Sequence, residues 1–345
     1  MTGKDVVSAL LGIRTAAVIR AAVELQVFDR LGDEALDADA LAARIEADPR
    51  GTRVLLNALA AVGVLDTDGA RFSIPAELAG PLIAGRDNWQ YIGTAVKLAT
   101  PYSEWEALGR LAEAVRHGGT VMGYNLETPG NEFLEEWAAN AYMGSDTAAL
   151  AELVWERLTT WAQTRSELDV LDVACGPGWY GLTVAANNPR ARVSLVDFPN
   201  IVAYAEKHAR ELAVQDRVRL LPGDMFTDPL AGPYDVAIAA GVMHHFSSER
   251  VRELLRRLHS VLKPGGRLVI VAPVADEADP AADPRAHLFS TVMLALTTEG
   301  QVHSYDSYHA MLADSGFAAP EIHSKDGSSM RLLIATRAER LASLE

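Results

Sequence analysis

The chain has 345 residues, which is enough for two domains with hydrophobic cores of their own. Hydrophobic residues make up 49% of it and charged residues 22%, as in an ordinary globular protein. The net charge of −15 argues against a nucleic-acid partner or an anionic membrane surface, because both attract basic proteins.

The N-terminus and the cysteine content indicate the compartment. The first 20 residues lack a basic region ahead of an apolar stretch, and Arg14 and Arg20 interrupt the apolar part, so no signal peptide is expected. No apolar run approaches the roughly 20 residues that a membrane-spanning helix needs. Cys175 is the single cysteine, which excludes an internal disulfide and fits a reducing compartment. We therefore expect a cytoplasmic protein.

Residues 1–85 are predicted to form a small winged-helix domain. Apolar residues recur at helical spacing over residues 6–31, which predicts one or two amphipathic helices. Short helices are predicted over 37–47 and 50–61, the second with proline in its first turn. Two short strands around an Asp-Gly turn predict a β-hairpin over 64–74. Two helices followed by a hairpin are typical of a winged helix.

A winged helix can read DNA, but the charge of this domain opposes that use. Residues 1–80 carry eight Lys and Arg residues against twelve Asp and Glu residues. The candidate recognition helix offers only Arg50 and Arg53, whereas a DNA reader needs a basic surface. The apolar content of residues 6–31 favours an intertwined homodimer instead. A ligand-sensing regulator of the winged-helix type is the alternative from a different functional class.

Residues 86–160 are predicted to be a helical linker that contributes to a substrate pocket. Helices are predicted over 88–115 and 131–161, and both are rich in aromatic residues. Most of these aromatics are expected to pack between helices, while some line an apolar pocket at a domain junction. The residues predicted to line that pocket, two of them from a later helix, are Phe133, Tyr142, Met143, Phe289 and Met293.

Residues 161–345 are predicted to form an α/β doubly wound, Rossmann-like sheet, because strands alternate with helices. Two further strands near the C-terminus are predicted to give this parallel sheet an antiparallel terminal strand. The strands are predicted over 168–173, 192–197, 218–221, 234–240, 267–271, 321–325 and 331–336.

A glycine-rich turn follows the first of these strands. Asp172 lies near the end of the strand, and Ala174, Gly176 and Gly178 lie in the turn. Such a turn brings backbone N–H groups and a helix N-terminus close to a ligand. With Gly181 the glycines also match G-x-G-x-x-G, a weak signal that dinucleotide-dependent oxidoreductases share. The oxidoreductase is therefore a competing interpretation.

Two more carboxylates follow the ends of neighbouring strands. Asp197 ends the second strand, where a carboxylate can accept hydrogen bonds from both hydroxyls of a ribose. Asp224 follows the third strand, where it can hold an adenine amino group while Met225 packs against the ring. An acid at this third strand end is not expected in a dehydrogenase.

These motifs together resemble class I S-adenosylmethionine-dependent methyltransferases. The resemblance rests on the stretch from Asp172 to Gly178, on Asp197, on Gly223-Asp224-Met225-Phe226 and on Leu262-Lys263-Pro264-Gly265-Gly266. With the winged-helix part, nearly all of residues 8–337 is similar to the plant-type, hydroxyindole-type small-molecule O-methyltransferases. The bacterial members of that family, which act in secondary metabolism and antibiotic biosynthesis, are the most similar.

The resemblance implies S-adenosylmethionine as the cofactor and S-adenosylhomocysteine as its product. It places the glycine turn at the methionine moiety, Asp197 at the ribose and Asp224 at the adenine. It further implies a homodimer and a small, aromatic or apolar acceptor. The residues implied to bind the cofactor are Asp172, Ala174, Gly176, Gly178, Asp197, Phe198, Asp224, Met225 and Phe226.

The segment after the fourth strand holds the catalytic base by the same resemblance. His244 matches the catalytic histidine of the family, while His245 replaces an aspartate and Phe246 replaces a tryptophan. A histidine has an unperturbed pKa of about 6.5, which suits removal of a proton from an acceptor hydroxyl. His244 and His245 are therefore the candidate catalytic residues. The structural alternative is that His244 only satisfies a local hydrogen bond.

Two carboxylates that support the base in the family are replaced here, by Ala272 and by Val302. The reaction therefore stays open between methyl transfer to oxygen, which we favour, and methyl transfer to nitrogen or carbon. Non-methylating chemistry on the same cofactor, such as hydroxylation, decarboxylation or cyclisation, is a third possibility. No metal site is expected, because adjacent histidines are poorly spaced as ligands.

Overall fold

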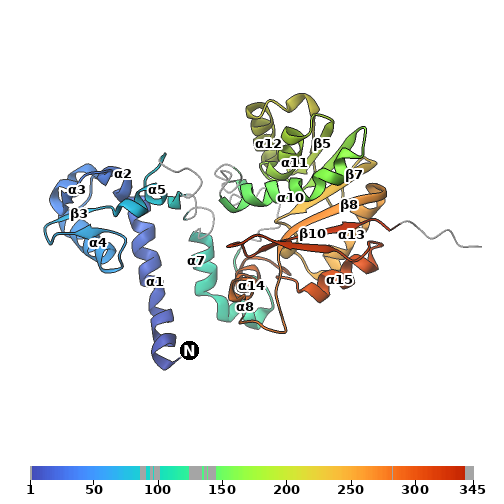
Figure 1. The fold of residues 1–345 in the computed structure, drawn as a ribbon. Coiled ribbons are helices and arrows are strands. Elements are labelled where there is room, and N and C mark those ends of the chain that lie inside the picture. The colour runs from blue at the N-terminus through green and yellow to red at the C-terminus, as the bar shows by residue number, and fades with distance from the viewer. Residues whose placement is uncertain are drawn as a thin grey trace, which may run out of the picture. The chain divides into compact units, whose positions relative to one another are not determined.

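The computed structural model describes the residues listed at the end of this paragraph and divides the chain into two compact units (Figure 1). These units are Met1–Pro101 and Tyr102–Glu345. The three-part division expected from the sequence stays a prediction. The described residues are 2–85, 91–93, 96, 102–123, 134–135, 138, 145–281 and 283–338.

The N-terminal unit combines a long helix with short helices and a three-stranded antiparallel sheet of order β1-β3-β2. Asp48 caps α4 by accepting a hydrogen bond from the backbone N–H of Gly51 at 2.8 Å. The expected helices and hairpin are confirmed, and β1 is an additional strand. The elements are α1 (Gly3–Glu24), α2 (Val27–Leu31), β1 (Leu36–Asp37), α3 (Ala38–Arg44), α4 (Pro49–Ala61), β2 (Asp66–Thr67), β3 (Arg71–Ser73), η1 (Ala76–Leu78) and α5 (Ala79–Leu82).

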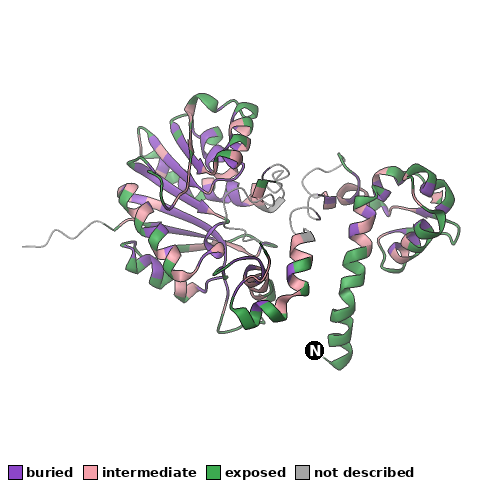
Figure 2. Cartoon of the chain, turned by 180° about the vertical axis from the view of Figure 1, so that it is seen from behind, coloured by how far each residue is buried: buried purple, intermediate pink, exposed green. Residues whose placement is uncertain are grey.

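Helix α1 presents apolar side chains to solvent along most of its length (Figure 2). Leu10 is 73% exposed and Ile13 is 65% exposed, whereas Ala22 near the C-terminal end is fully buried. By length and composition α1 is also apolar enough to cross a membrane, so the expectation that no segment meets this test was wrong. Five large apolar side chains of α1 are exposed, and a group of this kind is typical of an interaction surface: Val6, Val7, Leu10, Leu11 and Ile13.

The C-terminal unit is built on a seven-stranded sheet of order β6-β5-β4-β7-β8-β10-β9. The neighbouring strands from β6 to β8 are parallel, and β10 runs antiparallel to both β8 and β9. The predicted doubly wound sheet with an antiparallel terminal strand is confirmed. The strands are β4 (Leu168–Val173), β5 (Ala191–Asp197), β6 (Val218–Pro222), β7 (Tyr234–Ala240), β8 (Leu262–Pro273), β9 (Glu321–Ser324) and β10 (Met330–Thr336).

Helices cover both faces of this sheet (Figure 1). The helix expected over 88–115 is interrupted at Arg110 in the part that the structure describes. The remaining part of that helix and the start of the one expected over 131–161 lie outside the described residues. The helical elements are α7 (Tyr102–Gly109), α8 (Leu111–His117), α10 (Ser145–Gln163), α11 (Trp179–Asn187), α12 (Pro199–Glu211), η2 (Gln215–Arg217), η3 (Met243–His245), α13 (Ser248–Val261), α14 (Pro284–Leu296) and α15 (Tyr305–Asp314).

The alternation of side chains along β4 separates two hydrophobic cores. Leu171 and Val173 belong to the core that α13 and α15 cover. Leu168 and Val170 belong to the core that α10, α11 and α12 cover. Because successive side chains of a strand point to opposite faces, the apolar residues at both odd and even positions of β4 are buried on both sides of the sheet.

An ion cluster around one buried carboxylate joins the amino ends of β4, β7 and β8. Asp235 is 2% exposed and accepts hydrogen bonds from Arg165 Nη1 at 3.0 Å and Lys263 Nζ at 2.8 Å. Its carboxylate also accepts the backbone N–H of Asp169 at 2.9 Å. Lys263 donates a further bond to the Asp169 carboxylate, so every charge in the cluster has an opposite partner.

We expect Asp235→Ala to lower the free energy of unfolding by about 2–4 kcal/mol, because both cations lose the buried carboxylate that they share. Urea denaturation measures this change. The matched control is Glu167→Ala, since Glu167 pairs with Arg192 at 3.4 Å on the surface of the same unit. That substitution should cost less than about 1 kcal/mol. Equal losses in the two variants would contradict a stabilising role for the cluster.

Candidate active site

The predicted site residues gather at the carboxyl ends of β4, β5, β6 and β7. Strand order in the sheet reverses between β4 and β7, because β5 and β6 lie on one side of β4 and β8 lies beyond β7. In open α/β sheets the crevice at such a reversal is where ligands bind. The acids Asp172, Asp197 and Asp224 lie in or directly after three adjacent strands at this edge.

The glycine turn between β4 and α11 folds back sharply. Its backbone has positive φ at Ala174 (48°), Gly176 (53°) and Gly178 (84°). Glycine adopts this conformation freely, whereas an alanine there costs about 1–2 kcal/mol. Strain of this kind persists only where the surrounding structure holds it, and it concentrates at ligand-binding sites.

Asp172 holds the first turn of α11 against β4. Its carboxylate is buried and accepts the backbone N–H of Gly181 at 2.8 Å. A Cβ at Gly181 would lie 3.0 Å from that carboxylate and 2.9 Å from Val193 Cγ1, so only glycine allows this close approach. Burial raises the pKa of Asp172 to about 7. Asp172 therefore supports the turn, and its predicted contact with the cofactor stays a prediction.

Asp197 connects the same turn to the end of β5. One carboxylate oxygen accepts the backbone N–H of Gly176 at 2.8 Å, and the other accepts that of Phe198 at 2.8 Å. Burial raises the pKa of Asp197 to about 6. An ionised carboxylate has about four acceptor positions, so two further hydrogen bonds can be accepted here.

A histidine that the sequence analysis missed fastens the glycine turn from α12. Nδ1 of His208 lies 3.0 Å from the carbonyl oxygen of Pro177. Because a carbonyl can only accept a hydrogen bond, Nδ1 carries the hydrogen and donates it. The His208 ring also stacks on Trp179, with ring centroids 4.1 Å apart. No local pattern marks His208 for this role, since it lies 31 residues beyond Pro177.

The segment after β6 places Asp224 and Met225 in partly buried positions. The Asp224 carboxylate accepts the backbone N–H of Phe226 at 2.7 Å, and the Asp224 N–H donates to Asp228 at 2.8 Å. The carbonyl of Met225 accepts a hydrogen bond from Arg257 Nε at 2.9 Å. This network fixes the loop and leaves the second oxygen of Asp224 for a ligand.

Phe226 was expected to bind the cofactor, but its ring belongs to the core. It packs edge to face on Phe246 with centroids 5.0 Å apart. The guanidinium of Arg250 covers it at 3.6 Å from the ring centroid. The contribution of Phe226 to the site is therefore its backbone N–H, which Asp224 accepts.

The candidate catalytic histidines lie on the short turn η3 after β7. His244 is buried, and burial lowers its pKa well below the usual value, so the ring is neutral near pH 7. His245 is partly buried next to it, with ring centroids 4.7 Å apart, and burial lowers its pKa to about 4. Phe289 of α14 packs edge to face on His244 at 5.2 Å.

The surroundings of His244 are apolar where the family resemblance would place acids. Ala272 is fully buried in β8, and Val302 is buried in a small cluster that includes Phe289. The buried Nδ1 of His244 has no hydrogen-bond partner among the described residues. Within the part of the chain that the structure describes, no carboxylate therefore fixes the tautomer of this ring through Nδ1.

The predicted pocket residues are only partly described. Phe289 lies against His244, and its place in a substrate pocket stays a prediction. Met293 is buried one turn further along α14. Phe133, Tyr142 and Met143 lie outside the described residues.

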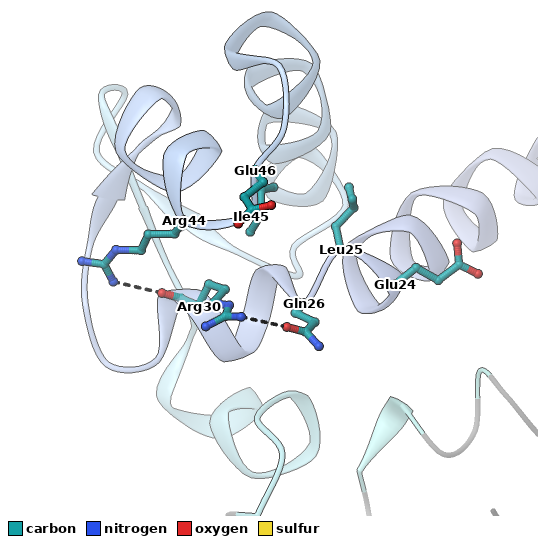
Figure 3. A pocket seen from close by; sticks show the side chains of 7 residues that line it. All are labelled: Glu24, Leu25, Gln26, Arg30, Arg44, Ile45 and Glu46. Atoms are coloured by element: carbon teal, nitrogen blue, oxygen red, sulfur yellow. Dashed lines mark hydrogen bonds between the residues drawn. The ribbon is translucent and has the colours of Figure 1, made fainter.

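A separate hollow lies in the N-terminal unit and contains none of the predicted site residues (Figure 3). Its volume is about 310 Å³. Its two arginines already have partners, since Arg30 donates to Gln26 at 3.2 Å and Arg44 pairs with Glu34 at 2.8 Å. The lining residues are Glu24, Leu25, Gln26, Arg30, Arg44, Ile45 and Glu46.

Comparison with known proteins agrees with this geometry. Residues 110–318 match an O-methyltransferase domain, and residues 7–78 match an O-methyltransferase dimerisation domain. Acetylserotonin O-methyltransferase of Mus musculus is 30% identical over 321 residues, which is 89% of this chain and 81% of that protein. The tetracenomycin polyketide synthesis 8-O-methyltransferase TcmO of Streptomyces glaucescens is 27% identical and covers 91% of both chains.

Two solved structures share the whole architecture. A protein from Nostoc punctiforme superposes with a TM-score of 0.88 over 97% of this chain and 99% of its own, and at 24% identity it shows the fold alone. Human N-acetylserotonin methyltransferase in complex with S-adenosylmethionine superposes with a TM-score of 0.75, at 25% identity and 97% coverage of each chain. The chain therefore belongs to the S-adenosylmethionine-dependent O-methyltransferase family, with a methyltransferase domain and a dimerisation domain.

Proposed function

We propose that this protein transfers a methyl group from S-adenosylmethionine to a hydroxyl of a small aromatic or apolar secondary metabolite. The observation that carries the proposal is the placement of Asp197 and Asp224 at adjacent strand ends beside the glycine turn, with His244 on the turn after β7. The acetylserotonin and tetracenomycin relatives support an aromatic acceptor and transfer to oxygen.

The residues at the crevice fit the cofactor. Asp197 keeps acceptor positions for two ribose hydroxyls, although it already holds the glycine turn. Asp224 and the partly buried Met225 suit an adenine amino group and its ring, and Phe198 starts α12 at the neighbouring strand end. When bound, the cofactor supplies a methyl group activated by a sulfonium. Asp172 and His208 hold the glycine turn, and this turn determines where the methionine moiety of the cofactor lies.

His244 acts in this proposal as an unassisted base. If Nε2 accepts the acceptor proton, Nδ1 carries the hydrogen of the neutral ring, and that buried N–H has no acceptor among the described residues. The depressed pKa makes the ring a weak base, but it keeps the ring unprotonated and available at neutral pH. Most of the rate enhancement then comes from holding the acceptor close to the methyl group in a water-poor pocket.

We expect His244→Gln to lower kcat by about 100-fold, the low end for loss of a general base, because no carboxylate strengthens this histidine. The assay uses N-acetylserotonin and a panel of hydroxylated polycyclic aromatics as acceptors. The affinity of His244→Gln for S-adenosylhomocysteine should equal that of the wild type. Transfer of a ¹³C-labelled methyl group shows by its chemical shift whether oxygen, nitrogen or carbon receives it. The control is His309→Gln on the exposed face of α15. An unchanged kcat would show that His244 is not a general base and that catalysis rests on holding the two substrates together.

We expect cofactor affinity to fall as the pH is lowered from 8 to 5, because Asp197, with a pKa of about 6, becomes protonated and loses acceptor capacity. Calorimetric titration with S-adenosylhomocysteine across this range measures the effect. Asp197→Asn should bind about 10-fold more weakly at pH 8 and show a much smaller pH dependence. The same pH profile in wild type and variant would rule out Asp197 as the titrating group.

We infer that the protein forms a homodimer through α1. The match to a dimerisation domain covers residues 7–78, and Leu10 and Ile13 present exposed apolar side chains within it. Such a surface is the kind that an obligate dimer covers.

We expect the double substitution Leu10→Glu with Ile13→Glu to give a monomer, since two charges cannot be buried in an apolar interface without partners. Sedimentation at micromolar concentration measures the mass. Val115→Glu serves as the control, because Val115 is an exposed apolar residue of α8 outside the dimerisation domain. A wild-type monomer, or a dimer that survives both charges, would overturn the assignment.

A further inference from the structure

The segment that follows α14, residues 297–304, contacts the backbone of the histidine turn η3. We name it the strap. Thr297 begins it by donating its hydroxyl to the carbonyl of Met293 at 2.6 Å and accepting the N–H of Gly300 at 2.8 Å. A Cβ at Gly300 would lie 2.8 Å from the carbonyl oxygen of His244 and 3.0 Å from that of His245, so glycine is required for this contact.

His303 of the strap holds the end of the histidine turn. Its Nε2 lies 3.1 Å from the carbonyl oxygen of Phe246, and its Nδ1 lies 3.4 Å from the hydroxyl of Ser248, the first residue of α13. The carbonyl can only accept, so Nε2 carries the hydrogen and Nδ1 accepts from Ser248. His303 is 2% exposed, and its ring packs edge to face on Tyr308 at 5.6 Å. These contacts fix both its position and its tautomer.

The strap itself is anchored in the sheet region. The carbonyl of His303 accepts the N–H of Ala275 at 3.1 Å, and Ala275 forms a parallel bridge with Ser304. Ser304 caps α15 by accepting the N–H of Ser307 at 3.3 Å. The donor that reaches Phe246 therefore extends from a segment that is hydrogen-bonded to its surroundings on both sides.

We propose that His303 is a positioning residue for His244: its hydrogen bond to Phe246 and the contact of Gly300 set the place of η3, a task that no carboxylate among the described residues performs on His244. The inference deepens the proposed function and rests on it. The described contacts of the His244 ring are its packing against His245 and Phe289, and Nδ1 has no hydrogen-bond partner among the described residues, so the ring position depends strongly on where the turn places it. His303 acts from 57 residues beyond Phe246 and touches no reacting atom.

The test compares two polar substitutions of His303. In His303→Gln the amide nitrogen takes the place of Nε2 and can donate to Phe246. In His303→Asn it takes the place of Nδ1 and cannot reach that carbonyl. Titration with S-adenosylhomocysteine counts the binding sites, and kcat is expressed per site. We expect this kcat to fall about 10- to 100-fold in His303→Asn, as for a misplaced catalytic group, and to stay within about 3-fold of wild type in His303→Gln. The KM for S-adenosylmethionine should be unchanged in both.

A double-mutant cycle with His244→Gln separates positioning from mere stabilisation. If His303 acts through His244, His303→Asn should cause no further loss of kcat once His244 has been replaced. A loss that adds fully to that of His244→Gln would overturn the proposal. Equal kcat values for His303→Asn and wild type would overturn it as well. His309→Asn, on the exposed face of α15, is the control for the substitution itself.

A readout without turnover distinguishes failure of this inference from failure of the proposed function. In the full-length protein with S-adenosylhomocysteine bound, the ¹³C-labelled ring of His244 gives a signal that His244→Gln identifies. This signal should shift in His303→Asn and keep its wild-type position in His303→Gln. An unmoved signal in His303→Asn would reject the positioning role. If wild type methylates no acceptor while the signal shifts as expected, the proposed function fails and the positioning role stands.

Discussion

Two carboxylates, one buried and one partly buried, hold the glycine turn, and the geometry of the crevice depends on them. Asp172 accepts the N–H of Gly181 from the helix side of the turn, and Asp197 accepts that of Gly176 from the strand side. The turn needs such restraint because Ala174 adopts a conformation that alanine disfavours. The acids at the strand ends therefore have unequal tasks. Asp172 is almost fully buried and holds the backbone on the helix side, whereas Asp197 is only partly buried and still has acceptor positions for a ligand.

Burial acts on the acids and the histidines of this edge in opposite directions, with one common result. It raises the pKa of Asp172 and Asp197 and lowers that of His244 and His245, so each group is displaced toward its neutral form. A sulfonium cofactor brings a positive charge into this weakly charged crevice. The positive charge then lowers the pKa of the carboxyl groups, because an opposite charge nearby favours the charged form.

The strands of the sheet and the acids at their ends were predictable, because they depend on local signals. Apolar runs give the strands, and the acid at each strand end is adjacent in sequence to the run it follows. Contacts between distant segments were not predictable. Nothing near His303 or His208 in the sequence shows that one faces Phe246 and the other Pro177. The direction of the Phe226 ring likewise depends on Phe246 and Arg250, which come from later elements.

Strand β4 is pinned at both of its ends. At its amino end the Asp235 cluster binds the N–H of Asp169, and at its carboxyl end Asp172 is tied to Gly181. The cofactor half of the crevice is therefore supported by contacts in which α14 takes no part. Directed evolution of acceptor range can exploit this separation, since libraries confined to positions around Phe289 on α14 alter the wall beside His244 without touching the contacts that hold the glycine turn. If the proposed function holds, the side of the crevice beside His244 can therefore vary while the contacts that hold the glycine turn stay in place.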